Sequence, residues 1–260
     1  MANKTRTEQE QFVVKANDLI RRTRYNLSTQ QQKIVLYAIS KIRPEDSPGT
    51  QYKLSIRDLC RACGIPIDKE GKYYNAIKED LQSLTKRLWV QMPDGKTEAT
   101  VSWIGDAMIT RGSGTVYIRF HELMAPFLFE LRSHYTQYQL ANVLVLRSKH
   151  AIRLYELLRS YYTQSDIDEW REKDVRFSVA ELRNLLAEDS YPRWADFERY
   201  VLRRTTDEIN ALCSEFNVTY KADKGKGRTI TDVTFTMYHP HAREGYEIMR
   251  RQTERLTKGL

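Results

Sequence analysis

Val175-Arg176-Phe177-Ser178-Val179-Ala180-Glu181-Leu182 is a short extended-type run that leads through a serine into a helix-type run. An earlier stretch, Tyr52-Lys53-Leu54-Ser55-Ile56-Arg57-Asp58-Leu59, has the same order of residue types. In each stretch the serine is suited to cap a helix that starts at the next residue, because its hydroxyl oxygen accepts a hydrogen bond from a nearby backbone N–H. The sequence therefore predicts the same strand-to-helix junction twice.

Further elements surround the first junction in a definite order. Ser28 and Gln31 form a capping box before a helix with apolar residues at helical spacing. After the junction, Gly64 ends the small helix, and a longer helix is expected from about residue 72 to 87. Strands at 88–92 and 100–104 then flank the turn Pro93-Asp94-Gly95-Lys96. Helix, helix and hairpin in this order are typical of a winged helix-turn-helix.

The second junction has a similar neighbourhood. Ser148 starts a helix, the strand at 175–177 follows, and a long helix is expected from about 192 to 213. Strands at 218–221 and 229–238 flank the turn Lys224-Gly225-Lys226-Gly227-Arg228. We therefore predict an α+β fold of two tandem winged helix-turn-helix domains, residues 1–133 and 134–238. The tail at 239–260 has no assigned role.

The charge of the chain favours a polyanionic partner. Among 260 residues, 42 Lys and Arg outnumber 34 Asp and Glu, which gives a net charge of +8. Acidic residues are absent from 19–43 and from 131–155, so the positive charge is unevenly distributed. No run approaches the roughly 18 apolar residues of a membrane helix, the first eleven residues lack a signal-type apolar core, and three cysteines make no disulfide framework. We expect a cytoplasmic protein without membrane partners.

The long helix of the second domain is the expected DNA reader. Its apolar ridge is Trp194, Phe197, Val201, Ile209 and Leu212. At about 100° per residue, the opposite face carries the following side chains of the types that read base edges: Arg199, Arg203, Thr206 and Asn210. The cations of the adjoining turn, Lys224, Lys226 and Arg228, suit phosphate or minor-groove contact.

The first domain is expected to make fewer base contacts. The face of its long helix opposite the core is less basic, with Asn75, Glu79, Gln82 and Lys86. Lys72 and Lys78 on the same helix, and Lys96 at the hairpin tip, are expected to bind phosphates, and Lys86 is also expected to contact DNA.

Three patterns that suggest chemistry have simpler interpretations. Cys60 and Cys63 have the spacing of half of a zinc site, but no second ligand pair lies nearby in the sequence. His239-Pro240-His241, with Tyr246 as a nucleophile, would suit a DNA-nicking enzyme, but the proline indicates the end of a strand. His150 and Arg153, which resemble part of a recombinase site, also suit an ordinary amphipathic helix. There is no phosphate-binding Gly-x-x-x-x-Gly-Lys loop. We predict no enzymatic activity, cofactor or metal.

Several of these strings together resemble the iteron-plasmid replication initiators (the Rep type 3 family). The similarity covers roughly residues 12–238. It is carried by the following segments: Val14-Lys15-Ala16-Asn17-Asp18-Leu19-Ile20, Leu27-Ser28, Lys33-Ile34-Val35-Leu36-Tyr37, Ser148-Lys149-His150-Ala151-Ile152-Arg153-Leu154-Tyr155-Glu156-Leu157-Leu158, Phe177-Ser178-Val179-Ala180-Glu181-Leu182 and the Lys-Gly-Lys-Gly-Arg turn at 224–228.

The resemblance implies a bacterial protein that binds directly repeated origin sequences (iterons) in double-stranded DNA. It implies monomers on iterons in equilibrium with homodimers, which associate through the first domain and repress their own promoter. It also implies opening of AT-rich origin DNA and recruitment of the host initiator and replicative helicase. Two alternatives stay open on the sequence: a winged-helix transcriptional regulator without a replication role, and a DNA-nicking enzyme.

Overall fold

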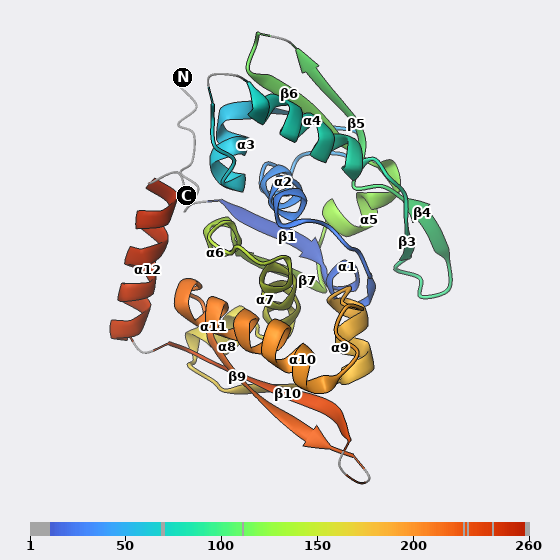
Figure 1. Cartoon of the computed structure of the whole chain (residues 1–260). Helices are drawn as coiled ribbons and strands as arrows, with labels where there is room; N and C mark the ends of the chain where they lie inside the picture. The colour runs from blue at the N-terminus through green and yellow to red at the C-terminus, as the bar shows by residue number, and fades with distance from the viewer. Residues whose placement is uncertain are drawn as a thin grey trace. The chain divides into compact units, whose positions relative to one another are not determined.

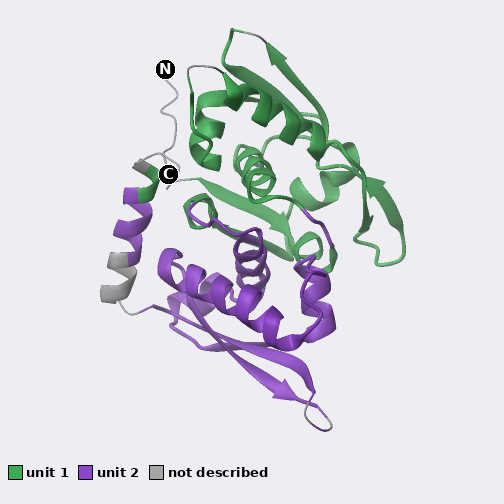
Figure 2. Ribbon diagram, in the orientation of Figure 1, with its two compact units in different colours: residues 1–23, 27–144, 255–260 green, residues 24–26, 145–254 purple. Residues whose placement is uncertain are grey.

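The computed structural model of the chain describes residues 11–68, 71–110, 112–225, 227, 229–240 and 242–257. These residues form two compact units (Figure 2). The first comprises residues 1–23, 27–144 and 255–260, and the second comprises 24–26 and 145–254. Along the chain, the first unit gives way to the second between Leu144 and Val145. Among the described residues, no helix is long and apolar enough to cross a membrane.

The first unit mixes short helices with three small antiparallel sheets (Figure 1). Its elements are β1 (Phe12–Ala16), α1 (Asn17–Arg22), α2 (Thr29–Ile39), β2 (Gln51–Ser55), α3 (Ile56–Cys63), α4 (Lys72–Leu84), β3 (Leu88–Gln91), β4 (Glu98–Val101), β5 (Ile104–Thr110), β6 (Thr115–Phe120), η2 (Glu122–Met124), α5 (Ala125–Leu128), β7 (Tyr135–Gln139) and α6 (Leu140–Leu144). The strand orders are β1-β7, β2-β6-β5 and β3-β4. Helices α2, α3 and α4 pack on one another, as the winged-helix order predicts.

The predicted caps of the first unit are present. The Ser28 hydroxyl accepts from the Gln31 backbone N–H at 3.1 Å, and the Gln31 side chain accepts from the Ser28 N–H at 3.0 Å. The Ser55 hydroxyl caps α3 by accepting from the Asp58 N–H. Gly64 ends α3 with φ 69°, a left-handed conformation that costs glycine little.

Cys60 and Cys63 lie on the buried face of α3. Burial raises the pKa of the Cys60 thiol to about 11 and also raises that of Cys63. A thiol with a raised pKa is a poor metal ligand at neutral pH, because the thiolate is the form that binds. No group of three or more metal-ligating side chains gathers among the described residues.

The second unit repeats the arrangement around one three-stranded sheet. Its elements are α7 (Lys149–Tyr161), α8 (Gln164–Asp168), β8 (Lys173–Ser178), α9 (Val179–Leu185), α10 (Trp194–Phe197), η3 (Glu198–Leu202), α11 (Arg203–Leu212), β9 (Asn217–Lys224), β10 (Ile230–Tyr238) and most of α12 (Ala242–Thr257). The strand order is β8-β10-β9, all antiparallel. Helices α7, α10 and α11 lie on one face of this sheet (Figure 1).

Aromatic rings and paired polar groups fill the core of the second unit. Tyr155 on α7 stacks on Phe216 at 5.3 Å between ring centroids, and its hydroxyl donates to Glu215 at 2.6 Å. The interpretation of α7 as an ordinary amphipathic helix is wrong, since every residue from Ala151 to Ser160 is buried. Its charged side chains are accommodated by partners, as in the 2.9 Å ion pair between Arg159 and Glu215. Burial of charges is tolerated where they are paired.

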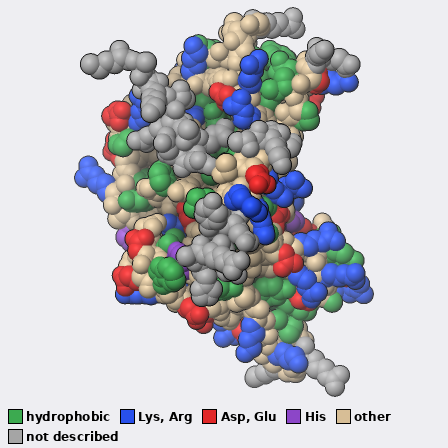
Figure 3. Space-filling model, turned by 90° about the vertical axis from the view of Figure 1, so that its left-hand side faces the viewer, with side chains coloured by type: hydrophobic (Ala, Val, Ile, Leu, Met, Phe, Trp, Pro, Cys, Tyr) green, Lys and Arg blue, Asp and Glu red, His purple; other side chains and the backbone are tan. Residues whose placement is uncertain are grey.

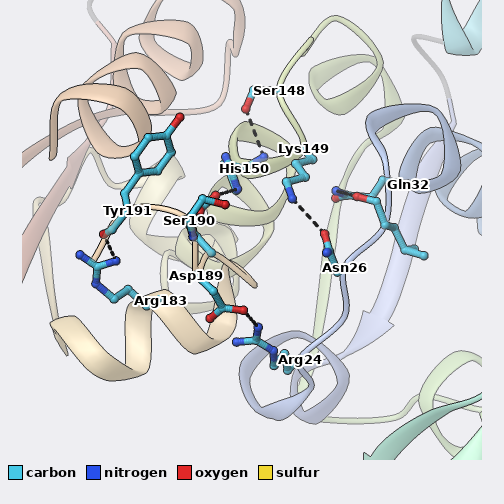
Figure 4. Close-up of polar contacts among 12 residues, drawn as sticks. Arg24, Asn26, Gln32, Ser148, Lys149, His150, Arg183, Asp189, Ser190 and Tyr191 are labelled. Atoms are coloured by element: carbon cyan, nitrogen blue, oxygen red, sulfur yellow. Dashed lines mark hydrogen bonds and ion pairs between the residues drawn. The ribbon is translucent and has the colours of Figure 1, made fainter. Parts of the chain in front are cut away.

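Residues 24–26, although they lie in sequence between α1 and α2, belong to the second unit. The Tyr25 hydroxyl donates to Glu156 at 3.2 Å, and the Arg153 guanidinium lies 4.5 Å from the centre of the Tyr25 ring. Arg24 pairs with Asp189, and Lys149 donates to Asn26 at 2.9 Å (Figure 4). Three consecutive residues therefore have their own partners in the second unit.

Candidate nucleic-acid interface

The expected DNA-reading helix is continuous from α10 through η3 to α11. Pro192 and Arg193 precede it, and Arg193 has the extended backbone conformation of an N-cap residue. The middle segment, Glu198–Leu202, is a π-helical turn, which holds one more residue than an α-helical turn. Turns of this kind are rare and frequently occur at functional sites.

The π turn changes which side chains face outward. At the regular helical angle, the outward row would be Arg199, Arg203, Thr206 and Asn210. Beyond the inserted residue, the row moves on by one position. Besides Ala195 on α10, the exposed side chains of this helix are accordingly Arg199 and Tyr200 on the π turn, and Arg203, Arg204 and Asp207 on α11.

The expectation that Thr206 and Asn210 face outward is therefore wrong. Thr206 is buried, and its hydroxyl donates to the Leu202 carbonyl at 3.0 Å. Asn210 is half-buried and bonded in both directions to one residue: its amide donates to the Val218 carbonyl at 2.8 Å, and its oxygen accepts from the Val218 N–H at 2.7 Å. The Thr206 hydroxyl thus bonds within its own helix, whereas the Asn210 side chain joins α11 to the start of β9.

Arg203 is exposed and held by an acidic partner. Its guanidinium lies 3.0 Å from Glu198, the first residue of the π turn, and the same Glu198 oxygen accepts from the Tyr220 hydroxyl at 3.0 Å. The hydrogen bond from Arg203 to Glu198 raises the pKa of the guanidinium, and burial raises the pKa of Tyr220. The Arg203 guanidinium is thereby restrained by Glu198.

On the π turn and α11, three exposed residues were not singled out by the sequence analysis: Tyr200, Arg204 and Asp207. The Tyr200 ring lies close to two guanidinium groups, at 5.4 Å from Arg199 and 5.3 Å from Arg204. The double arginine at 203–204 was visible in the sequence. The π turn that brings Arg204 to the surface was not, because no residue-type pattern specifies it.

The hairpin of β9 and β10 carries the predicted wing. Lys224 is exposed at the end of β9, and Lys221 on the same strand is also exposed. Lys226 and Arg228 lie outside the described residues. Gly227 has φ 88°, and a Cβ on Gly225 would lie 2.5 Å from the Thr231 methyl group, so both positions favour glycine.

One further cation lies at the edge of the same sheet. Arg176 on β8 pairs with Asp232 on β10 at 3.1 Å, where β10 has a register irregularity. Hydrogen bonds from Thr231 and Arg176 lower the pKa of the Asp232 carboxyl. Arg176 is exposed, but its charge is compensated locally.

In the first unit, the expected phosphate-binding lysines are exposed. Lys72 and Lys78 project from α4, and Lys86 follows its C-terminus. Lys96 sits in the β3–β4 turn, which Asp94 stabilises by accepting from the backbone N–H groups of Lys96 and Thr97 at 2.9 Å each. Figure 3 shows one face of the molecule, on which Lys and Arg side chains are interspersed with acidic ones.

Comparison with known proteins finds two matching families. Residues 12–159, more than half of the chain, match the family described as initiator replication protein WH1, and residues 178–237 match initiator Rep protein WH2. The chain is also similar to the solved structure described as "Crystal structure of Pi initiator protein in complex with iteron DNA". The identity is 19% and the TM-score 0.71, over 90% of this chain and 99% of that one. At this identity the likeness shows a shared fold. The prediction of an α+β fold with two tandem winged helices is confirmed.

Proposed function

This chain belongs to the family of initiator replication proteins, and from that membership we propose that it starts plasmid replication by binding iterons in double-stranded DNA. The observation that carries the proposal is the outward row of arginines on the helix from α10 to α11, beside a hairpin with exposed lysines. A helix of this kind suits the major groove, and guanidinium forks suit guanine edges.

The helix and the hairpin of this surface would make different kinds of contact with DNA. Arg199 and Arg203 on the helix would contact base edges, and Lys224 on the hairpin would contact phosphates. The burial of Thr206 and Asn210 removes them from the proposed contacts. Lys226 and Arg228 remain proposed phosphate ligands on the basis of the sequence alone.

The second domain, which the sequence analysis placed at residues 134–238, is the proposed main DNA reader, and the first, placed at 1–133, is proposed for dimerisation and secondary DNA contacts. The two compact units of the structure divide between Leu144 and Val145, about ten residues later. The exposed lysines of the first unit, Lys72, Lys78, Lys86 and Lys96, support the secondary contacts. Promoter repression by the dimer, opening of AT-rich DNA, and recruitment of the host initiator and helicase are parts of the proposal that rest on family membership.

The protein would act by binding, without catalysis. The nicking alternative needs His241 and the Tyr246 side chain, both outside the described residues. It is tested by incubating supercoiled origin DNA with the protein and magnesium or manganese. Nicking that Tyr246→Phe abolishes would contradict the proposal.

The initiator role is tested by plasmid maintenance. A plasmid that carries the gene and its flanking DNA should depend on the protein for replication. The transcriptional regulator would be favoured instead if the plasmid is maintained equally well after deletion of the gene and the protein, where it is present, represses its own promoter.

Arg203→Ala and Lys224→Ala should weaken DNA binding in different ways. Arg203→Ala should cost about 1–3 kcal/mol and relax the preference at one base pair. Lys224→Ala should weaken binding to all sequences alike and lower the slope of log K against log salt by about one. Affinity measurements on specific and random duplexes at several salt concentrations distinguish the two. Identical behaviour of the two variants would contradict this division of contacts.

A further inference from the structure

Tyr200 occupies an unusual place for an aromatic side chain. It lies on the π turn, and the residue is 36% exposed. The guanidinium groups of Arg199 and Arg204 are 5.4 Å and 5.3 Å from the ring centre, within the range of a cation–π interaction. One ring thus contacts two cations of the outward row.

The Tyr200 ring is itself supported by a second aromatic ring. Tyr191, in the segment before α10, stacks on Tyr200 with 5.4 Å between centroids and an interplanar angle of 27°. Arg183 on α9 donates to the backbone carbonyl of Tyr191 (Figure 4). It also donates to the carbonyl of Pro192, and its guanidinium lies 4.2 Å from the centre of the Phe197 ring. The segment that carries Tyr191 is therefore fixed to the core of the second unit.

Arg199 and Arg204 differ from Arg203 in their acidic partners. Arg203 pairs with Glu198 at 3.0 Å. Within the described part of the chain, Arg199 and Arg204 have no carboxylate within 4.0 Å, and the Tyr200 ring is their recorded partner. An aromatic face orients a guanidinium group without neutralising it, so the N–H donors at its edge remain available.

We propose that Tyr200 is a positioning residue that fixes the guanidinium groups of Arg199 and Arg204, and that Arg204 determines the preference for one guanine in the bound sequence. This inference rests on the proposed function of the same surface. A mobile arginine loses side-chain entropy when it binds, and a group already held in place loses less. A guanidinium fork matches the O6 and N7 acceptors of guanine in the major groove.

The experiment uses the full chain and duplexes with a randomised stretch of about two helical turns, roughly 20 base pairs. Sequences bound by the wild-type protein are selected, and the best duplex becomes the probe for the variants. The set is Tyr200→Leu, Tyr200→Phe, Arg204→Ala, Arg204→Lys and the exposed control Arg250→Ala on α12.

We expect Arg204→Ala and Arg204→Lys both to remove the preference at one G·C base pair, because lysine lacks the fork. Tyr200→Leu should reduce affinity for the selected duplex by about two- to fivefold, the fold-change that corresponds to an exposed cation–π contact. It should leave the slope of log K against log salt unchanged, since no charge is lost. Tyr200→Phe and Arg250→Ala should bind as the wild type does.

The positioning role is measured by coupling. In the presence of Tyr200→Leu, the additional loss from Arg204→Ala should be smaller than in the wild-type background. If Tyr200→Leu does not fold, Tyr191→Leu removes the supporting ring from outside the helix and should give the same partial loss. If the affinity losses of Tyr200→Leu and Arg204→Ala are additive in the double variant, or if Arg204→Ala keeps the base preferences of the wild type, the inference is overturned. A wild-type protein that selects no sequence would instead overturn the proposed function.

Discussion

At the scale of single residues, the π turn at Glu198–Leu202 determines which side chains of the helix from α10 to α11 face outward. Arg199 and Arg203 are exposed as expected, but Thr206 and Asn210 bond to the protein's own backbone. Both errors follow from one inserted residue. A helical wheel assumes a constant angle, and the π turn breaks that assumption between Glu198 and Leu202.

Asn210 should matter for stability and not for base preference. Asn210→Ala leaves the N–H and the carbonyl of Val218 without their side-chain partner, and both groups are buried. We expect the free energy of unfolding to fall by about 1–3 kcal/mol. Urea denaturation measures this change. The exposed neighbour Asp207→Ala is the matched control and should change stability by less than about 0.5 kcal/mol. An altered base preference in folded Asn210→Ala would restore the original assignment.

At the scale of elements, local signals predicted well and distant pairings did not. The serine-capped junctions before α3 and α9 were predicted because a cap involves residues three apart. Strand β1 was not predicted as a strand, since it pairs with β7, whose residues are more than a hundred positions away. Strand β5 was missed for a related reason: its pairing with β6 through a register irregularity leaves no clean alternation in the sequence.

The cap of α9 gives an element-scale prediction. The Ser178 hydroxyl accepts from the Glu181 backbone N–H at 3.1 Å. Ser178→Ala should lower the free energy of unfolding by about 0.5–2 kcal/mol. Ser178→Asp should keep most of the wild-type stability, because a carboxylate also caps a helix. Thermal unfolding by circular dichroism compares the two. Ser165→Ala, which removes an exposed hydroxyl inside α8, is the control. Equal loss in the Ala and Asp variants would rule out capping as the cause.

At the scale of the whole molecule, duplication of the winged helix could be seen in the sequence, because each copy repeats the same order of elements. No pattern in the sequence indicates that residues 24–26 belong with the second copy. Tyr25 is almost fully buried there, and burial raises the pKa of its hydroxyl. Its partners Arg153 and Glu156 lie on α7, more than a hundred residues later, so no local pattern links them.

Removal of Tyr25 should therefore weaken the second unit. Tyr25→Ala removes the ring that faces Arg153 and the hydroxyl that donates to Glu156, which is 1% exposed. We expect a loss of about 3–5 kcal/mol, as for other buried aromatic side chains. Hydrogen exchange should rise in α7 and stay unchanged in α4. Tyr135→Ala, an exposed tyrosine of the first unit, is the control. Faster exchange in α4 alone would contradict the unit assignment of residues 24–26.

The assignment of Arg24, Tyr25 and Asn26 to the second unit also has a consequence for recombination between such proteins during evolution. A chimera joined at Leu144 and Val145 would take its reading domain from one parent and this tripeptide from the other. The tripeptide of one parent would then have to pair with α7 and Asp189 of the other parent, with which it did not co-evolve. Functional hybrids should consequently inherit two separate pieces of the donor gene, one of them only three codons long.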